Sequence, residues 1–149
     1  MALKGKFDEA WFERKVAEAI EVRRREVIET LMFIGNECVA EAKGKGSYTD
    51  RTGNLRNSVG YVIFDDGEVV HQYFDKTASG TERGEDDPLA IGRGLAEKVG
   101  SGQNGMVLVV VAGMKYAVYV EARGYNVLTS AELLANAELP RILNDLGLK

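Results

Sequence analysis

The sequence predicts an α+β fold in which helices at both ends of the chain enclose a small, mainly antiparallel sheet. The first observation is glycine, because 14 of the 17 glycines fall between Gly44 and Gly124. The second is the order of the segments, since helical periodicity and β-branched runs do not alternate as in βαβ units. With 149 residues, of which 45% are hydrophobic, the chain is expected to form a single domain over residues 1–149.

Residues from about 7 to 42 are expected to form one long helix, because they contain no proline and a single glycine, Gly35. Apolar side chains recur there at the spacing of one helix face; they are Phe12, Val16, Ile20, Val27, Leu31, Ile34, Cys38 and Ala42. At about 1.5 Å per residue this helix spans roughly 50 Å, more than the diameter of a compact domain of this size. Part of it is therefore expected to project or to lie against a neighbouring subunit.

The centre of the chain is predicted to hold a β-hairpin between two charged loops. Residues 58–64 and 68–74 are rich in valine, isoleucine and aromatic residues, and residues 65–67 between them contain an Asp-Gly turn signal. Residues 43–57 form a polar, flexible loop with a net charge of +3, and residues 75–87 form a flexible acidic loop. From the hairpin turn to the end of the acidic loop the net charge is −6, so the two loops are opposite in charge.

A middle helix and a buried strand are expected next. Asp87 has the character of a helix N-cap and Pro88 that of a first-turn residue. This helix is expected to end at Gly100. The apolar, β-branched residues 106–112 are predicted to form the central strand of the sheet, which Gly113 ends.

The C-terminal region is predicted to end in a further helix. Residues 115–122 fit either a short helix or a strand, and residues 125–128 fit a short strand. Residues 129–132 (TSAE) match a capping box, which opens a helix that runs to about Leu146. Pro140 is expected to kink or split this helix.

The sequence contains no residue pattern typical of a catalytic or metal site. His71 and Cys38 are the only histidine and the only cysteine, so there is no Cys–His zinc motif and no disulfide within the chain. The acidic runs at residues 65–66 and 85–87 could attract a divalent cation, but a hairpin turn and a helix cap explain them. We therefore expect no enzymatic activity, no cofactor and no metal.

Charge and hydropathy argue against other classes. The most apolar run, at residues 106–112, is far shorter than the roughly 20 residues needed to span a bilayer, and no signal-peptide segment is evident. The net charge of −4 argues against a dedicated nucleic-acid-binding protein. A lone cysteine favours the cytosol, so a soluble cytosolic chain is expected.

Two short motifs resemble those of a known family. The first is TGNLRNS at residues 52–58, between the long helix and the hairpin, and the second is YAVYVEARG at residues 116–124, after the apolar strand. In this order they resemble the gene-product-ten-like family of phage tail-completion, or head–tail joining (neck), proteins. The resemblance covers about residues 7–146. The chain departs from the family where Ala122 and Arg123 separate the glutamate from the glycine, and in its longer acidic loop.

The resemblance implies a structural role in phage or prophage assembly. Several copies, often six, are expected to form a ring between the head connector and the tail tube, around a channel that DNA crosses without specific binding. The implied partners are further copies of the chain and the connector, head-completion and tail-tube proteins, with no membrane. The implied location is the host cytoplasm during assembly and then the virion neck. The candidate interaction residues are Arg51, Thr52, Gly53, Leu55, Arg56, Ser58, Tyr116, Tyr119, Glu121 and Gly124.

Physical roles follow for some of these residues, and each role also fits simple fold maintenance. In the first motif, Gly53 is expected to take a backbone conformation that a side chain resists, and Leu55 to anchor the loop in the core. A head-to-tail ring needs two complementary patches. We therefore expect the loop at residues 43–57 of one subunit to contact the acidic loop of another, or the next ring, with the opposite charges steering the contact.

In the second motif, the rings of Tyr116 and Tyr119 are expected to pack against the sheet while their hydroxyls reach polar partners. Glu121 is expected to accept hydrogen bonds from the backbone or from an arginine such as Arg56.

Other functions fit the sequence as well. A tail terminator or minor capsid protein of similar fold is one alternative, and a small-ligand- or nucleic-acid-binding module of a bacterial host is another. A metal-dependent hydrolase that uses the acidic loop and His71 is the third, and a metal-dependent activity abolished by His71→Ala would favour it.

Overall fold

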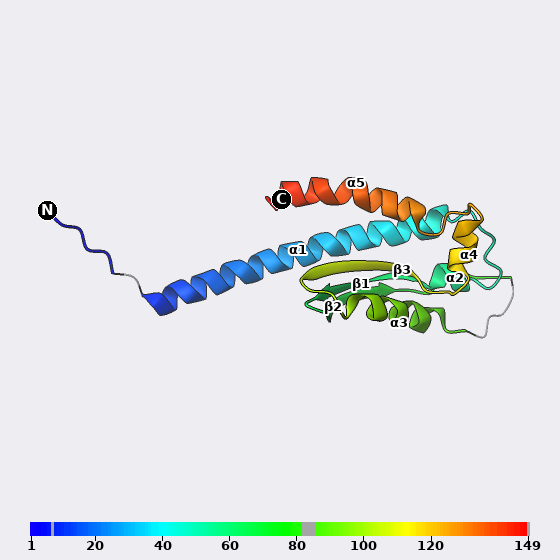
Figure 1. Cartoon of the computed structure of the whole chain (residues 1–149), viewed down its shortest axis with the longest axis horizontal. Coiled ribbons are helices and arrows are strands. Elements are labelled where there is room, and N and C mark those ends of the chain that lie inside the picture. Colours follow the sequence, from blue (N-terminus) through cyan, green and yellow to red (C-terminus); the bar gives the residue numbers. More distant parts are fainter. Residues whose placement is uncertain (7, 82–85, 149) are drawn as a thin grey trace.

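The computed structural model of the chain describes residues 1–6, 8–81 and 86–148 (Figure 1). The described residues form five helices and one three-stranded antiparallel sheet, so the predicted α+β class is confirmed. In chain order the elements are α1 (Glu9–Lys45), α2 (Asn54–Asn57), β1 (Val59–Asp65), β2 (Glu68–Phe74), α3 (Pro88–Gly100), β3 (Met106–Ala112), α4 (Ala117–Ala122) and α5 (Thr129–Asp145).

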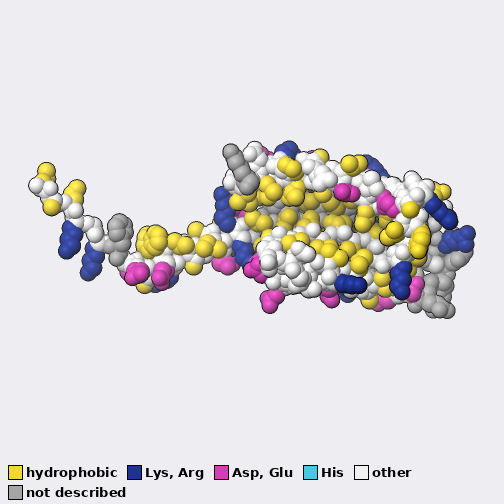
Figure 2. All heavy atoms as spheres, in the orientation of Figure 1, with side chains coloured by type: hydrophobic (Ala, Val, Ile, Leu, Met, Phe, Trp, Pro, Cys, Tyr) yellow, Lys and Arg dark blue, Asp and Glu magenta, His cyan; other side chains and the backbone are white. Residues whose placement is uncertain are grey.

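The long helix α1 outruns the rest of the molecule. Asp8 caps its first turn by accepting hydrogen bonds from the backbone nitrogens of Ala10 (3.1 Å) and Trp11 (3.4 Å), whereas Phe7, the expected start, lies outside the described residues. At about 1.5 Å per residue, the 37 residues of α1 span about 55 Å. Its buried residues lie between Leu31 and Ala42, and the N-terminal half extends beyond the sheet, with apolar side chains at its surface (Figures 1 and 2).

The sheet has the order β2-β1-β3. Val62 of β1 lies opposite Gln72 of β2 and Val109 of β3. The prediction that residues 106–112 form the central strand is therefore wrong. Strand β1 is central and almost completely buried, whereas β3 is an edge strand whose apolar side chains are covered less fully. The apolar composition of β1 and β3 does not show which of them is central, because helices lie on both faces of the sheet.

The predicted hairpin is confirmed. Asp66 and Gly67 form its turn with φ values of 50° and 84°, and two positive φ values are typical of a type I′ hairpin turn. The turn is also tied to the loop before β3, because the Gly105 nitrogen donates to Asp66 Oδ1 (2.7 Å) and the Asp66 nitrogen to the Gly105 carbonyl (2.9 Å).

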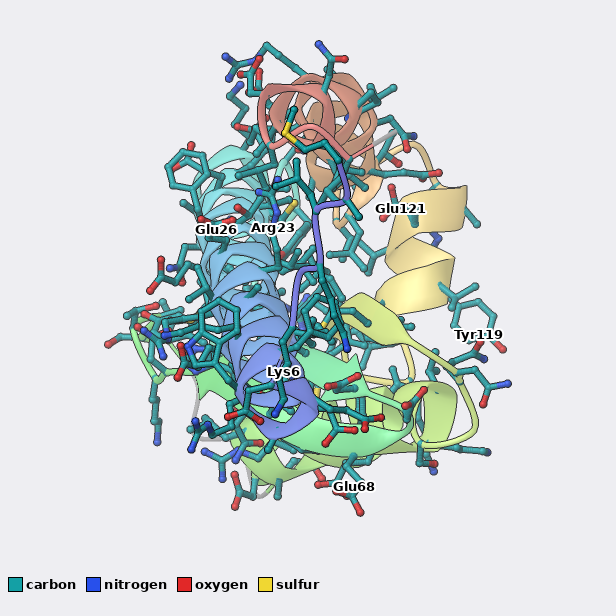
Figure 3. All side chains as sticks on the ribbon, turned by 90° about the vertical axis from the view of Figure 1, so that its left-hand side faces the viewer. Lys6, Arg23, Glu26, Glu68, Tyr119 and Glu121 are labelled. Atoms are coloured by element: carbon teal, nitrogen blue, oxygen red, sulfur yellow. The ribbon has the colours of Figure 1, made fainter. Side chains whose placement is uncertain are left out.

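Two apolar layers hold the elements together. Tyr61 and Ile63 of β1 join the cluster that faces α1, and Val62 and Phe64 join the one that contains Ala96 of α3. This alternation is that of a strand buried on both faces. Helix α5 packs on α1, so α1 lies between α5 and the sheet (Figures 1 and 3).

Some segments differ from their predictions. Residues 43–57 are not a single loop, since they contain the end of α1 and the short helix α2. Residues 115–122 contain the helix α4, one of the two expected alternatives, whereas residues 125–128 contain no strand. Helix α5 is not split by Pro140. Both Pro140 and Asn136 are exposed, so water can reach the Asn136 carbonyl that the proline leaves without a donor.

Two glycines of α1 give a matched test of its packing on the sheet. A Cβ on Gly35 would lie 2.8 Å from the ring of Tyr61, which is fully buried and tied by its hydroxyl to Asn36 Oδ1 (3.2 Å). A Cβ on Gly44 would meet nothing within 4 Å. We expect Gly35→Ala to lower the free energy of unfolding by about 1–3 kcal/mol through overpacking. Gly44→Ala should raise it by up to about 1 kcal/mol through helix propensity.

Urea unfolding of both variants measures this difference. A Gly35→Ala variant as stable as the Gly44→Ala variant would contradict the close contact between α1 and Tyr61.

Candidate functional site

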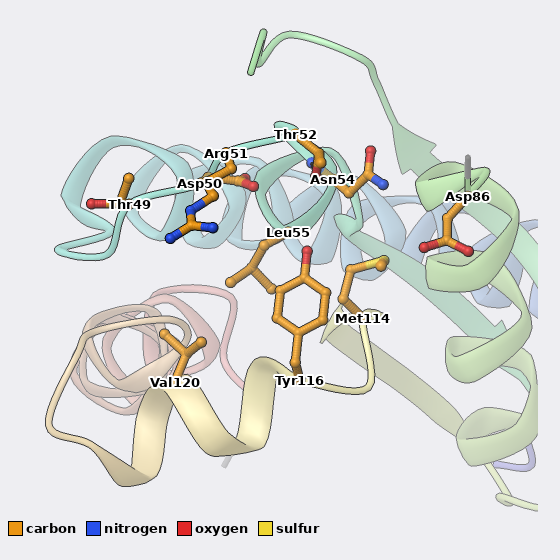
Figure 4. Close-up of a pocket in the computed structure, with 10 residues that line it drawn as sticks. All are labelled: Thr49, Asp50, Arg51, Thr52, Asn54, Leu55, Asp86, Met114, Tyr116 and Val120. Carbon is orange, nitrogen blue, oxygen red and sulfur yellow. Dashed lines mark hydrogen bonds between the residues drawn. The ribbon is translucent and has the colours of Figure 1, made fainter. Parts of the chain in front are cut away.

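The two sequence motifs meet at the end of the sheet where β1 begins and β3 ends. Ser58 of the first motif is tied to the segment just before the second motif, because its hydroxyl donates to the Leu55 carbonyl (2.8 Å) and accepts from the Met114 nitrogen (3.3 Å). Between α2 and α4 lies an open pocket of about 550 Å³ (Figure 4). Its lining residues are Thr49, Asp50, Arg51, Thr52, Asn54, Leu55, Asp86, Met114, Tyr116 and Val120.

The start of the first motif forms a tight turn into α2. Gly53 is the N-cap of α2 with φ at +75°, a region that favours glycine. A Cβ there would also lie 2.8 Å from the Ala78 carbonyl oxygen. Thr52 Oγ1 accepts a hydrogen bond from the Asn54 nitrogen (3.2 Å), and the Leu55 side chain is buried in the core.

Arg56 stabilises the C-terminal end of α1. Its guanidinium donates to the carbonyls of Lys43 (3.3 Å), Gly46 (2.9 Å) and Tyr48 (3.4 Å), and it lies 4.7 Å above the Tyr48 ring. A cation here satisfies carbonyls that the helix leaves free and complements its dipole. Arg56 thus binds the end of α1, and among the described residues no hydrogen bond joins it to Glu121.

The two oppositely charged loops contact each other within the same chain. Lys43 forms an ion pair with Asp75, and the Asn57 side chain both donates to and accepts from the Ala78 backbone (2.8 Å each). Burial raises the pKa of Asp75, but its hydrogen bonds from Lys43 and Tyr73 lower it by more. Because Lys43 pairs with Asp75 of its own chain, it does not take part in the contact expected between subunits. Residues 82–85 of the acidic loop lie outside the described residues.

Glu121 is the N-terminal cap of α5. Its carboxylate accepts hydrogen bonds from the backbone nitrogens of Val127 (3.0 Å), Leu128 (3.0 Å) and Thr129 (3.3 Å), and from the Thr129 hydroxyl. Burial raises its pKa, but these hydrogen bonds lower it by more, so the pKa lies below its ordinary value. Asn126 completes the cap, since its Oδ1 accepts from the Ser130 nitrogen (3.0 Å).

The prediction that residues 129–132 form a capping box is therefore wrong, because other residues cap the helix. Helix α5 does begin at Thr129, but the capping carboxylate is Glu121, eight residues earlier in the chain, and Glu132 is exposed.

Gly124 ends α4. Its φ is +84°, its nitrogen donates to the Glu121 carbonyl (2.9 Å), and the Tyr125 nitrogen donates to the Val120 carbonyl (3.4 Å). This is the Schellman arrangement at a helix C-terminus. Ala122 and Arg123, which depart from the family pattern, are the last helical residue and the C-cap.

The two motif tyrosines differ in exposure. Tyr116 is 39% exposed and its hydroxyl points towards Thr52, a polar partner of the kind predicted (Figure 4). Tyr119 is 73% exposed and lies at the surface (Figure 3), so the prediction that its ring packs against the sheet is wrong. Burial and the nearby Asp50 carboxylate raise the pKa of Tyr116. In the six-residue helix α4, Ala117 takes the buried position, so Tyr119 faces outward.

Sequence reasoning missed two members of this surface. Val118 is 74% exposed and Tyr125 is 47% exposed. The signal was available, because a short helix has one buried side and residues next to a buried position must face solvent. Together with Tyr116 and Tyr119 they are the exposed apolar side chains of α4 and of the residues just before and after it, here called the α4 surface.

The ten candidate residues thus fall into two groups. Those that build turns, caps or core contacts are Thr52, Gly53, Leu55, Arg56, Ser58, Glu121 and Gly124. Those whose side chains are exposed enough to contact a partner are Arg51, Tyr116 and Tyr119.

The single histidine and the single cysteine of the sequence lie on different elements, β2 and α1. His71 lies on β2 with its ring 5.8 Å from that of Tyr61, whereas Cys38 is buried with its Sγ 3.5 Å from the Ala131 carbonyl. Among residues 1–6, 8–81 and 86–148, no group of three or more His, Cys, Asp or Glu side chains could hold a metal ion. In the same part of the chain, no helix is long and apolar enough to cross a membrane.

Comparisons of the chain with protein-family models, with curated proteins and with solved structures find no match.

The Glu121 cap makes stability depend on pH. Because the folded-state pKa lies below the ordinary value of 4.5, its contribution is present above that pH and is lost as pH falls through the folded-state pKa. We expect Glu121→Gln to lower the free energy of unfolding by about 1 kcal/mol at pH 7, the typical size of a helix cap. The difference from wild type should shrink on acidification.

The matched control is Glu132→Gln, which removes the exposed carboxylate of the same helix. Denaturant unfolding at pH 7 and below pH 4 measures both variants. Equal effects of the two substitutions at pH 7 would contradict the assignment of the cap to Glu121.

Proposed function

We propose that this chain is a structural subunit of a phage or prophage neck, a tail-completion or head–tail joining protein that assembles as a ring. The observation that carries the proposal is the pair of motifs at residues 52–58 and 116–124, in the order of the family that they resemble. Residues of both motifs, Leu55 and Tyr116 among them, line one pocket at the end of the sheet, which supports the view that the motifs form one unit.

The α4 surface and Arg51 are the proposed contacts to the next component. Tyrosine and arginine side chains are enriched in protein interfaces, where an aromatic ring supplies large contact area at low entropic cost. The residues beneath this surface, Glu121 and Gly124, fix α4 against α5 and hold the tyrosines in place.

The proposed role is non-catalytic and needs no cofactor. The partners are further copies of the chain and the connector, head-completion and tail-tube proteins, and DNA crosses the assembly without specific binding. The site of action is the host cytoplasm during assembly and then the virion.

Deletion of the gene from the phage or prophage that carries it tests the proposal. We expect filled heads and finished tails that remain separate in electron micrographs, with infectivity restored by the wild-type gene. Intact virions from the deletion strain would overturn the neck assignment.

Complementation with single variants tests the α4 surface. Tyr119→Glu should fold with an unchanged melting temperature, because the side chain is 73% exposed, yet fail to restore joining. Tyr119→Phe, which keeps the ring, is the matched control and should restore it. Full complementation by Tyr119→Glu would show that the partner binds elsewhere.

A further inference from the structure

The projecting half of α1 carries an apolar stripe that continues the buried one. Phe12, Val16 and Ile20 are 58%, 42% and 60% exposed, and they repeat at the four-residue spacing of one helix face. Farther along the helix the same face turns inward, where Leu31 and Ile34 belong to the core. One side of α1 is thus apolar over its whole length but buried over only half of it.

A groove opens on that same side of α1, beside its buried half. It has a volume of about 540 Å³ and lies between the α1-facing side of β3 and the helix α5, with α1 as its floor. The residues that line it are apolar except for Glu132, and they include Leu31, Ile34, Leu108, Ala135 and Leu139. Figure 2 shows apolar side chains gathered along this hollow and on the projecting helix.

The projecting helix is long enough to span the groove. Residues 9–26 of α1 span about 27 Å at about 1.5 Å per residue. The groove is lined from Leu128 to Leu139 along α5, roughly 18 Å, and from Met106 to Val110 along β3, roughly 17 Å. A helix of this length laid in the groove would cover all of it.

We propose that the projecting half of α1 of one copy occupies the β3–α5 groove of a second copy, and that the exchange is reciprocal. The stripe and the groove open on the same side of α1, so a second copy placed antiparallel against that side fills both at once. Such a two-fold contact uses the same surface on both copies.

The buried area agrees with reciprocal exchange. Over the roughly 18 Å of the groove, half the lateral surface of a helix about 10 Å wide is on the order of 300 Å². One helix in one groove therefore removes on the order of 600 Å² from solvent, counting both sides, which is the size of a weak contact. Two such contacts remove about 1,200 Å², the lower end of the range of stable interfaces.

The charge of the projecting segment and its stability as a helix also agree with insertion into the groove. Residues 9–26 carry five acidic and five basic side chains, so the inserted segment brings no net charge to the groove. A helical segment with few tertiary contacts is only marginally stable in water, because most helix stability in proteins comes from packing of the apolar face. The groove of a second copy supplies that packing.

Cross-linking between two tagged forms of the full chain tests the contact directly. Both carry Cys38→Ser, one carries Val16→Cys in the stripe, and the other carries Ala135→Cys in the groove. A short thiol-specific cross-linker should join the two forms into a mixed dimer. Val22→Cys in place of Val16→Cys is the control, because position 22 lies roughly 200° around the helix from Ile20 and should cross-link poorly.

The mass in solution gives an independent readout. Ile20→Glu should weaken self-association by at least about tenfold, because it buries an unpaired charge. Val22→Glu, at a position 52% exposed, should leave self-association unchanged, and circular dichroism checks that both variants fold. A wild-type chain that stays monomeric at all concentrations, or equal cross-linking from positions 16 and 22, would overturn the proposal. The proposed contact between two copies does not rest on the neck assignment, since two copies can pair even if deletion of the gene leaves virions intact.

Discussion

Helix α1 is longer than the sheet and the helix α5 that cover it, and the rest of the structure depends on this difference in length. Helix α1 has an apolar face over its whole length, but the sheet and α5 cover that face only from about Leu31 to Ala42. Over the buried half, Gly35 lets the helix approach Tyr61, and an ion pair between Arg24 and Asp65 (2.8 Å) lies near the point where α1 leaves the sheet. The remaining apolar surface, which includes Phe12, Val16 and Ile20, is exposed, and the proposed exchange with a second copy would cover it.

The motifs act mainly as helix terminators, which explains why they combine small, polar and charged residues. Arg56 binds the end of α1, Glu121 caps the start of α5 and Gly124 closes α4. Three helix ends are thereby held at one end of the sheet, and the tyrosines of α4 are placed on the outside. In this account the motifs fix the helix ends, and the side chains that are exposed there contact the next component of the proposed assembly.

Local features could be predicted from the sequence, and long-range partners could not. The Asp-Gly turn and the Asp87-Pro88 helix start were recognisable because neighbouring residues determine them. The position of β3 at the sheet edge, the Glu121 cap and the Lys43–Asp75 ion pair depend on residues far apart in the chain. In the candidate site, Gly53 and Leu55 had predictable environments, whereas the exposure of Tyr119 depended on α4 being a helix rather than a strand.

Amide hydrogen exchange of α1 at several protein concentrations tests the central claim most directly, namely that the projecting half of α1 is completed by a second copy. Residues 31–42 should be strongly protected at every concentration, because their own chain buries them. Residues 9–26 should exchange rapidly in dilute protein and become protected as concentration rises. Exchange of residues 9–26 that does not change with concentration would contradict the account.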